Sequence, residues 1–171
     1  LIIWQLPTQS SSIINESYNF KTSKLVSDGN SIFISNNKNE FYSIDVKTGT
    51  TNWISDITSN ITPVITGNLI FTVSNEGYLY AIEKNKGNII RVTDLFKIYK
   101  QKKRKNIYPI GFVIGNKNLY LTNSDGKMIV VDLQNGSIIK TEKVSSNLVS
   151  KPFIFNNNLF LIRNGSIVQY N

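Results

Sequence analysis

The fold of this chain is decided by the stretch SIDVKTGTTNW, residues 43–53. It begins with a small or apolar residue, continues through an acidic residue, Asp45, and reaches Gly49 four positions later. The same order returns in AIEKNKG (residues 81–87) and VVDLQNG (residues 130–136). The glycines that end the three copies are 38 and 49 residues apart. The chain is therefore built from internal repeats of about 40 residues.

A second repeated pattern runs in phase with the first. Short segments rich in Ile, Val, Phe and Tyr lead into turns that contain Asn, Asp or Gly, and they span residues 30–35, 68–73, 118–122 and 158–162. Such segments are typical of β-hairpins. No segment shows the three-and-four spacing of apolar residues that marks a helix, so we expect almost no helix. Four short antiparallel strands in each repeat predict an all-β chain of propeller blades.

The repeated residues have structural roles in this interpretation. The Asp side chain can accept hydrogen bonds from backbone N–H groups two or three residues later, and the Gly supplies the positive φ of the loop. Trp53 follows Gly49 on the outer strand, where its ring can wedge against the next blade. Trp4 stands in the same place in the preceding blade. The structural signature therefore consists of Trp4, Asp45, Gly49, Trp53, Glu83, Gly87, Asp132 and Gly136.

We expect about four blades, which is half of an eight-bladed propeller. The expected parts are an outer strand of the preceding blade plus a loop (1–23), a first blade (24–57), a second blade (62–96), a basic insertion (97–109), a third blade (110–144) and an incomplete last blade (150–171). Residues 1–7 lack an initiator Met, a basic segment and a cleavage site. We therefore expect the chain to be part of a longer protein.

The composition limits the chemistry of the chain. Its 171 residues are 40% hydrophobic and 18% charged, which is sufficient for a packed core. His and Cys are absent, which excludes Ser-His-Asp and Cys-His nucleophiles, the usual zinc ligands and disulfides. No run of apolar residues is long enough to cross a membrane as a helix. We expect a protein that is not an enzyme and has no catalytic, cofactor-binding or metal-binding residues.

One dense cluster of basic residues stands out in a chain of net charge +8. These candidate partner-binding residues are Lys100, Lys102, Lys103, Arg104 and Lys105. They are suited to phosphate, to anionic lipid or to an acidic protein surface, and the alternative is a solvated loop. Nucleic-acid binding would require aromatic side chains among the basic ones, and only Tyr99 and Tyr108 flank the cluster. We expect no nucleic-acid partner.

Residues 43–53 resemble the repeat signature of the pyrroloquinoline-quinone (PQQ)-type propeller family, with Arg91 and Lys140 at the Trp position of the later copies. One branch of that family, the quinoprotein dehydrogenases, binds PQQ with Ca²⁺, and many of its members carry adjacent cysteines. The other branch is the BamB type of outer-membrane assembly lipoprotein, which is eight-bladed and non-catalytic. Residues 157–171 are similar to the closing blade of the BamB type.

The BamB resemblance implies a protein-interaction scaffold without a cofactor, on the periplasmic side of the outer membrane. Its partners would be other proteins of an outer-membrane assembly complex, and a lipid anchor outside this sequence would attach it to the membrane. The alternatives are a PQQ-dependent quinoprotein dehydrogenase and a ligand-sensing propeller domain of a receptor. The open edges of the first and last blades predict either a head-to-tail homodimer that completes an eight-bladed ring or closure within one chain; we expect the homodimer.

Overall fold

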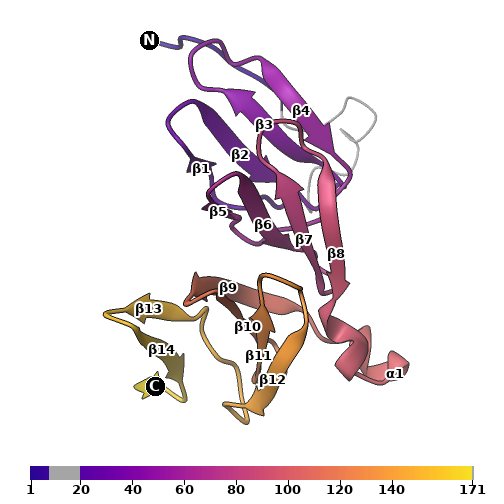
Figure 1. The fold of residues 1–171 in the computed structure, drawn as a ribbon, viewed down its shortest axis with the longest axis vertical. Helices are drawn as coiled ribbons and strands as arrows, with labels where there is room; N and C mark the ends of the chain where they lie inside the picture. Colours follow the sequence, from indigo (N-terminus) through magenta and orange to yellow (C-terminus); the bar gives the residue numbers. More distant parts are fainter. Residues whose placement is uncertain (8–19, 171) are drawn as a thin grey trace. The chain divides into compact units, whose positions relative to one another are not determined.

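A computed structural model describes residues 1–7 and 20–170 of the chain. Within these residues the strands form three four-stranded sheets and one three-stranded sheet, and each sheet uses strands in the order in which they follow in the sequence (Figure 1). Consecutive small sheets of this kind are propeller blades. The all-β propeller fold predicted from the repeats is confirmed.

The blades are numbered in chain order. Blade 1 contains β1 (Val26–Ser27), β2 (Ser31–Ser35), β3 (Phe41–Asp45) and β4 (Thr51–Ser55). Blade 2 contains β5 (Val64–Thr66), β6 (Leu69–Val73), β7 (Tyr78–Glu83) and β8 (Ile89–Asp94). Blade 3 contains β9 (Pro109–Gly115), β10 (Asn118–Asn123), β11 (Lys127–Asp132) and β12 (Ile138–Lys143). Blade 4 contains β13 (Phe153–Phe155), β14 (Asn158–Arg163) and β15 (Ser166–Tyr170).

The chain divides into two compact units. The first consists of Leu1–Asn75 with Tyr80–Ile90, and the second consists of Glu76–Leu79 with Arg91–Asn171. Blade 1 lies in the first unit, blades 3 and 4 lie in the second, and the strands of blade 2 contribute to both. The contact of Trp53 with Lys84 lies within the first unit, and that of Arg91 with Leu133 lies within the second.

The basic insertion contains two short helical turns where the sequence predicts a loop. A 3₁₀ turn, η2 (Leu95–Ile98), is followed by α1 (Gln101–Arg104). The Asp94 side chain caps the first turn by accepting a hydrogen bond from the Phe96 backbone N–H at 3.0 Å. Leu95 and Phe96 are fully buried, so the insertion is anchored to the second unit at its start.

Residues 1–7 form no strand, although the sequence predicts an outer strand there. A strand requires a neighbour for its backbone hydrogen bonds, and within the described residues no strand pairs with this segment. Most of the loop expected within residues 1–23 lies outside the described residues.

The turn between β3 and β4 shows why Asp and Gly recur. The Asp45 carboxylate accepts hydrogen bonds from the backbone N–H groups of Lys47 at 2.9 Å and Thr48 at 2.8 Å. These bonds, chiefly the one from Thr48, hold the pKa of Asp45 below its ordinary value. Gly49 has a φ of 72°, a backbone conformation that favours glycine. The Asp132 carboxylate accepts the two equivalent bonds in blade 3.

The core of the first unit lies between blade 1 and blade 2. Phe33 and Phe41 are fully buried, and they pack with Trp53 against Ile70 and Ile82 of blade 2. The rings of Phe41 and Trp53 are stacked, with centroids 5.7 Å apart and planes 9° apart. Trp53 thus joins two blades, and each blade buries an apolar face that it could not bury alone.

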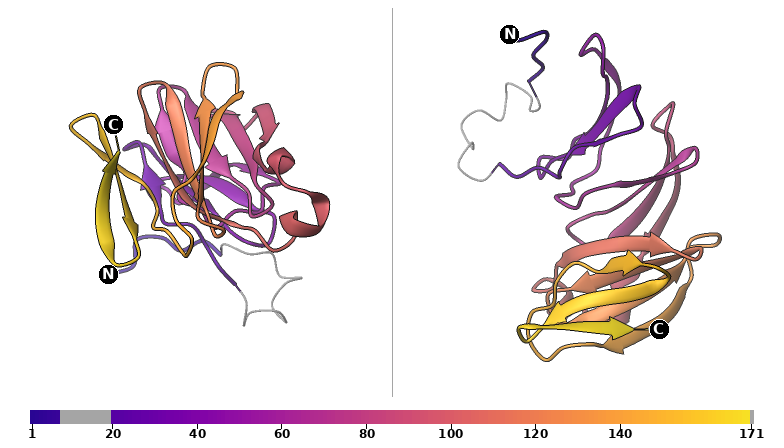
Figure 2. Two further views of the ribbon diagram at one scale, coloured as in Figure 1. Left: turned by 90° about the horizontal axis from the view of Figure 1, so that it is seen from below. Right: turned by 90° about the vertical axis from the view of Figure 1, so that its left-hand side faces the viewer.

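The second unit has an equivalent core between blade 3 and blade 4. Met128 and Val130 of β11 pack with Leu159 and Leu161 of β14, and all four side chains are buried. The C-terminal sheet of β13, β14 and β15 therefore lies beside blade 3 (Figure 2, right).

Replacing Trp53 by Ala should lower the free energy of unfolding by about 3–5 kcal/mol, because the change removes a large buried ring and leaves a cavity between two blades. Urea denaturation followed by circular dichroism measures the loss. The matched control is Ile54→Ala, since Ile54 is the exposed neighbour of Trp53 on β4. The control should change the stability by no more than about 0.5 kcal/mol. Equal effects of the two changes would contradict the inter-blade role of Trp53.

Candidate functional site

The junction between blade 1 and blade 2 shows how neighbouring blades are joined. The Trp53 indole N–H donates to the carbonyl of Lys84 at 2.9 Å, in the turn that follows β7. The Trp53 ring covers Gly87 so closely that a Cβ on this glycine would lie 2.6 Å from the ring. The Ser55 hydroxyl donates to the Gly87 carbonyl at 2.9 Å, and the Glu83 carboxylate holds the turn through Asn88.

An ion pair supports the same junction. The Lys84 ammonium lies 2.8 Å from a carboxylate oxygen of Asp28 in the turn before β2. This contact, together with hydrogen bonds from the backbone N–H groups of Ser31 and Asn30, lowers the pKa of Asp28 to about 2. Asp28 therefore stays ionised at any pH near neutrality, and Lys84 binds blade 1 with both its side chain and its carbonyl.

Trp4 makes the same contact on the other side of blade 1. Its indole N–H donates to the carbonyl of Val46 at 2.9 Å. A Cβ on Gly49 would lie 2.5 Å from the Trp4 ring. Trp4 also packs with Leu6 against the face of blade 1 that carries Tyr42. The segment thus occupies the place that an outer strand of a preceding blade would take.

Arg91 makes the equivalent contact from blade 2 to blade 3. Its guanidinium donates to the carbonyls of Leu133 at 2.6 Å and Gln134 at 2.8 Å, in the turn after β11. A Cβ on Gly136 would lie 2.8 Å from the Arg91 Nε. An arginine therefore replaces the tryptophan and keeps the bond to the carbonyl that follows the acidic residue.

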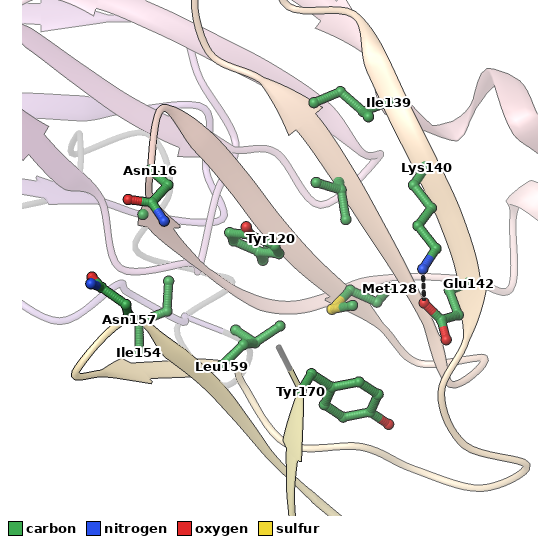
Figure 3. A pocket seen from close by; sticks show the side chains of 12 residues that line it. Asn116, Tyr120, Met128, Ile139, Lys140, Glu142, Ile154, Asn157, Leu159 and Tyr170 are labelled. Carbon is green, nitrogen blue, oxygen red and sulfur yellow. Dashed lines mark ion pairs between the residues drawn. The ribbon is translucent and has the colours of Figure 1, made fainter.

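Lys140, at the same position of β12, makes no such contact within the described residues. Its ammonium pairs with the Glu142 carboxylate at 2.6 Å. Beside this pair lies a cavity of about 360 Å³ between blades 3 and 4, lined on its apolar side by Tyr120, Met128, Leu159 and Tyr170 (Figure 3). The cavity therefore lies beside the residue whose counterparts, Trp53 and Arg91, bond to a turn of the adjacent blade.

Blade 4 has an apolar face without a partner among the described residues. We call this the open face; its exposed members are Phe153, Phe155, Ile162 and Ile167. They line a shallow groove of about 550 Å³, and the Phe153 and Phe160 rings contact each other with centroids 6.5 Å apart. The opposite face of the same sheet is buried against blade 3. Exposed patches of this kind mark interaction sites.

The structure divides the basic cluster predicted from the sequence. Lys102 and Lys103 line a groove of about 430 Å³ together with Lys127 and Lys143 of blade 3. We call this the basic groove; Tyr99 and Asp125 lie in it between the lysines. Lys100 and Lys105 are exposed at the two ends of α1 and do not line it. Local sequence gave no signal for Lys127 and Lys143, because only the tertiary fold brings them to α1.

Arg104 turns away from the basic groove. Its guanidinium donates to the Asp94 carboxylate at 2.7 Å and lies 5.0 Å from the centroid of the Tyr78 ring. The bond to Asp94 holds the pKa of Arg104 above its ordinary value. Arg104 therefore pins α1 to the second unit, whereas the sequence groups it with the partner-binding residues.

Two further observations concern the remaining chemistry. In residues 1–7 and 20–170, no three side chains of the His, Cys, Asp or Glu types gather into a group that could hold a metal ion. In the same part of the chain, no helix has the length and apolar character required to cross a lipid bilayer.

Replacing Arg104 by Ala should lower the stability by about 1 kcal/mol, because the change removes an ion pair and a cation–π contact that are partly shielded from water. Lys103→Ala is the matched control on the same helical turn and should have almost no effect. Urea denaturation of both variants checks the difference. An Arg104→Ala variant as stable as the control would show that Arg104 does not anchor α1.

The solved structures most similar to this one include β-propellers of several kinds. BamB from Moraxella catarrhalis aligns with a TM-score of 0.68 and 16% identity. The alignment covers 86% of this chain and 41% of the BamB chain. The computationally designed Ika4 protein aligns with a TM-score of 0.67 and 11% identity, over 87% of this chain and 89% of Ika4. The propeller domain of Cps50 (Swd1) from Myceliophteria thermophila aligns with a TM-score of 0.61 and 12% identity, over 78% of this chain and 45% of that one. At such identities the likeness concerns the fold alone.

Sequence comparison is more specific. No curated protein sequence matches the chain. The family model of the outer membrane protein assembly factor BamB matches residues 2–93, which is more than half of the 171 residues. This segment contains Trp4, Trp53 and the turns that receive them. The chain therefore belongs to the family of the outer membrane protein assembly factor BamB.

Proposed function

We propose that this chain is part of a non-catalytic scaffold of the BamB type, which binds other proteins of an outer-membrane assembly complex. Its place would be the periplasmic side of the outer membrane, where β-barrel proteins are inserted. The observation that carries the proposal is the family match over residues 2–93, which includes both blade-joining tryptophans.

The blade junctions support a scaffold role. Trp4 and Trp53 lock blade 1 to its neighbours in the first unit, and Arg91 bonds to blade 3 in the second. Each contact fixes a turn at the end of a blade, so the loops of each unit are held by a stiff frame. Loops held in this way are where proteins of many folds place their binding residues.

The test uses the organism that carries the gene. Deleting the gene should lower the amount of folded β-barrel protein in the outer membrane, and the tagged protein should co-purify with other members of the assembly machinery. Normal β-barrel levels together with an absence of these partners would overturn the proposal. Adding PQQ and Ca²⁺ to the purified protein is the complementary assay, because PQQ-dependent oxidation of an alcohol would instead identify a quinoprotein dehydrogenase.

We also propose that a second copy of the chain covers the open face. Within the described residues, β15 has a strand neighbour on one side only, and its free edge can accept another strand. Phe160 lies in the middle of this face, at the repeat position that Phe33 holds in blade 1. Phe33 is completely buried against blade 2. The open face thus lacks the covering blade that Phe33 has.

Residues 1–6 supply the means of joining two copies. They already dock on blade 1 in the manner of an outer strand, through Trp4, while Leu1, Ile2 and Ile3 are exposed. If this segment of one copy pairs with β15 of the other, it places blade 1 of the first copy against the open face of the second. Two copies joined head to tail in this way complete a closed ring of eight blades.

Light scattering should therefore report about twice the 19.4 kDa mass of the chain. Ile167→Lys should reduce the assembly to single chains, because it places a charge in the open face. The matched control is Ile90→Lys, which changes a similarly exposed isoleucine on β8 of a complete sheet. A monomer mass for the unaltered protein would contradict the dimer. A monomer in which Trp4 is also shielded from fluorescence quenchers would indicate closure within one chain.

A further inference from the structure

We infer that the basic groove binds an acidic segment of a partner protein, with its lysines pairing with Asp or Glu carboxylates of that segment. The basic groove combines α1 of the insertion with two strands of blade 3, all within the second unit. The proposed scaffold function names no ligand for the basic groove. Binding of an acidic segment follows from the contacts and charges of this groove alone.

The floor of the basic groove is held in one arrangement by hydrogen bonds. The Tyr99 hydroxyl donates to the Asp125 carboxylate at 3.1 Å and accepts from the Asn123 side-chain amide at 3.2 Å. The Tyr99 ring meets the ring of buried Phe96 edge-on, with centroids 5.3 Å apart. Burial and the nearby Asp125 carboxylate hold the pKa of Tyr99 above its ordinary value, so the phenol stays a neutral donor.

The wall formed by α1 is also fixed before any partner arrives. Arg104 holds this turn through Asp94 and Tyr78, and Lys102 and Lys103 are left exposed on the side of the basic groove. Neither lysine has an acidic partner among the described residues. A preorganised wall lowers the entropy cost of binding, because only the side chains of Lys102 and Lys103 remain to be ordered.

The opposite wall adds two more cations to the basic groove. The Lys127 ammonium lies 4.6 Å from the Tyr99 ring centroid and 3.8 Å from a carboxylate oxygen of Asp125. The Lys143 ammonium donates to the backbone carbonyl of Asp125. Asp125 is the one acidic residue among the described lining residues, against four lysines. The excess of positive charge in a concave surface attracts anions and concentrates their field.

The composition of the basic groove favours a peptide over a phosphate-rich partner. Ile107 adds an apolar contact that suits the stem of a peptide side chain. Tyr99 is buried and the Lys127 ammonium lies over its ring, so it offers no free face on which a nucleic-acid base could stack.

The binding test uses the whole chain and a fluorescent ten-residue peptide that alternates Glu with Leu and Ser. Fluorescence anisotropy measures the affinity at low and at physiological salt. The matched peptide has Gln in place of every Glu, and it should bind at least about tenfold more weakly, with little dependence on salt. Equal binding of the two peptides would overturn the inference.

Variants locate the binding on the protein. The Lys102→Gln, Lys103→Gln double variant should weaken binding of the acidic peptide by about tenfold and flatten its salt dependence. The matched control is Lys24→Gln, Lys47→Gln, which removes the same charge from exposed lysines outside the basic groove and should change the affinity less than about twofold. Equal losses in both double variants would show attraction to the net charge alone and would contradict a specific site. Unchanged urea midpoints confirm that both variants fold.

Two further measurements distinguish the remaining ligands and positions. Vesicles of phosphatidylglycerol and a single-stranded oligonucleotide should bind more weakly than the peptide at equal negative charge; tighter binding of either one would overturn the choice of an acidic protein segment. A carbodiimide joins a lysine directly to a carboxylate with which it is paired. Mass spectrometry should find the peptide linked to Lys102, Lys103, Lys127 or Lys143, and links chiefly to other lysines would overturn the site.

Discussion

The rest of this structure depends on one contact, in which a long side chain packs on the glycine-containing turn of the neighbouring blade. The turn must offer a backbone carbonyl that accepts a hydrogen bond from the indole N–H. It must also have glycine at the contact, because the Trp4 and Trp53 rings lie where a Cβ of Gly49 or Gly87 would stand. Glycine is thus required at these positions for space as well as for its positive φ. Once the turn is docked, the apolar faces of neighbouring sheets meet, and each sheet gains the partner that it needs to be stable.

The third junction shows which part of this contact is essential. Arg91 cannot offer an apolar ring of the size of indole, but it keeps the hydrogen bond to the first carbonyl of the turn and adds a second bond. Hydrogen bonding to that carbonyl is therefore common to all three junctions, whereas the aromatic ring is common to two. The blade 2 to blade 3 junction is consequently more polar, and its strength depends more on the fixed geometry of a guanidinium than on burial.

The sequence predicts the parts of the structure that are set by local chemistry. The hairpins and the position of Trp53 follow from a period of about 40 residues. It does not predict that Arg91 docks like a tryptophan, because that requires the neighbouring turn in three dimensions. It also places Lys103 and Arg104 together, although adjacent residues of a helical turn point in different directions. The basic groove needs Lys127 and Lys143, which only long-range packing brings to α1.

The location of both tryptophans at junctions of the first unit has a spectroscopic consequence. Indole emission arises only from Trp4 and Trp53, because the second unit contains tyrosine and phenylalanine as its aromatic residues. Light that excites indole alone therefore observes the environment of blade 1 and its neighbours, while the second unit remains dark. Circular dichroism, in contrast, averages over the strands of both units. The two signals from one sample thus form a built-in pair of probes that can tell whether the units lose their structure together or one after the other.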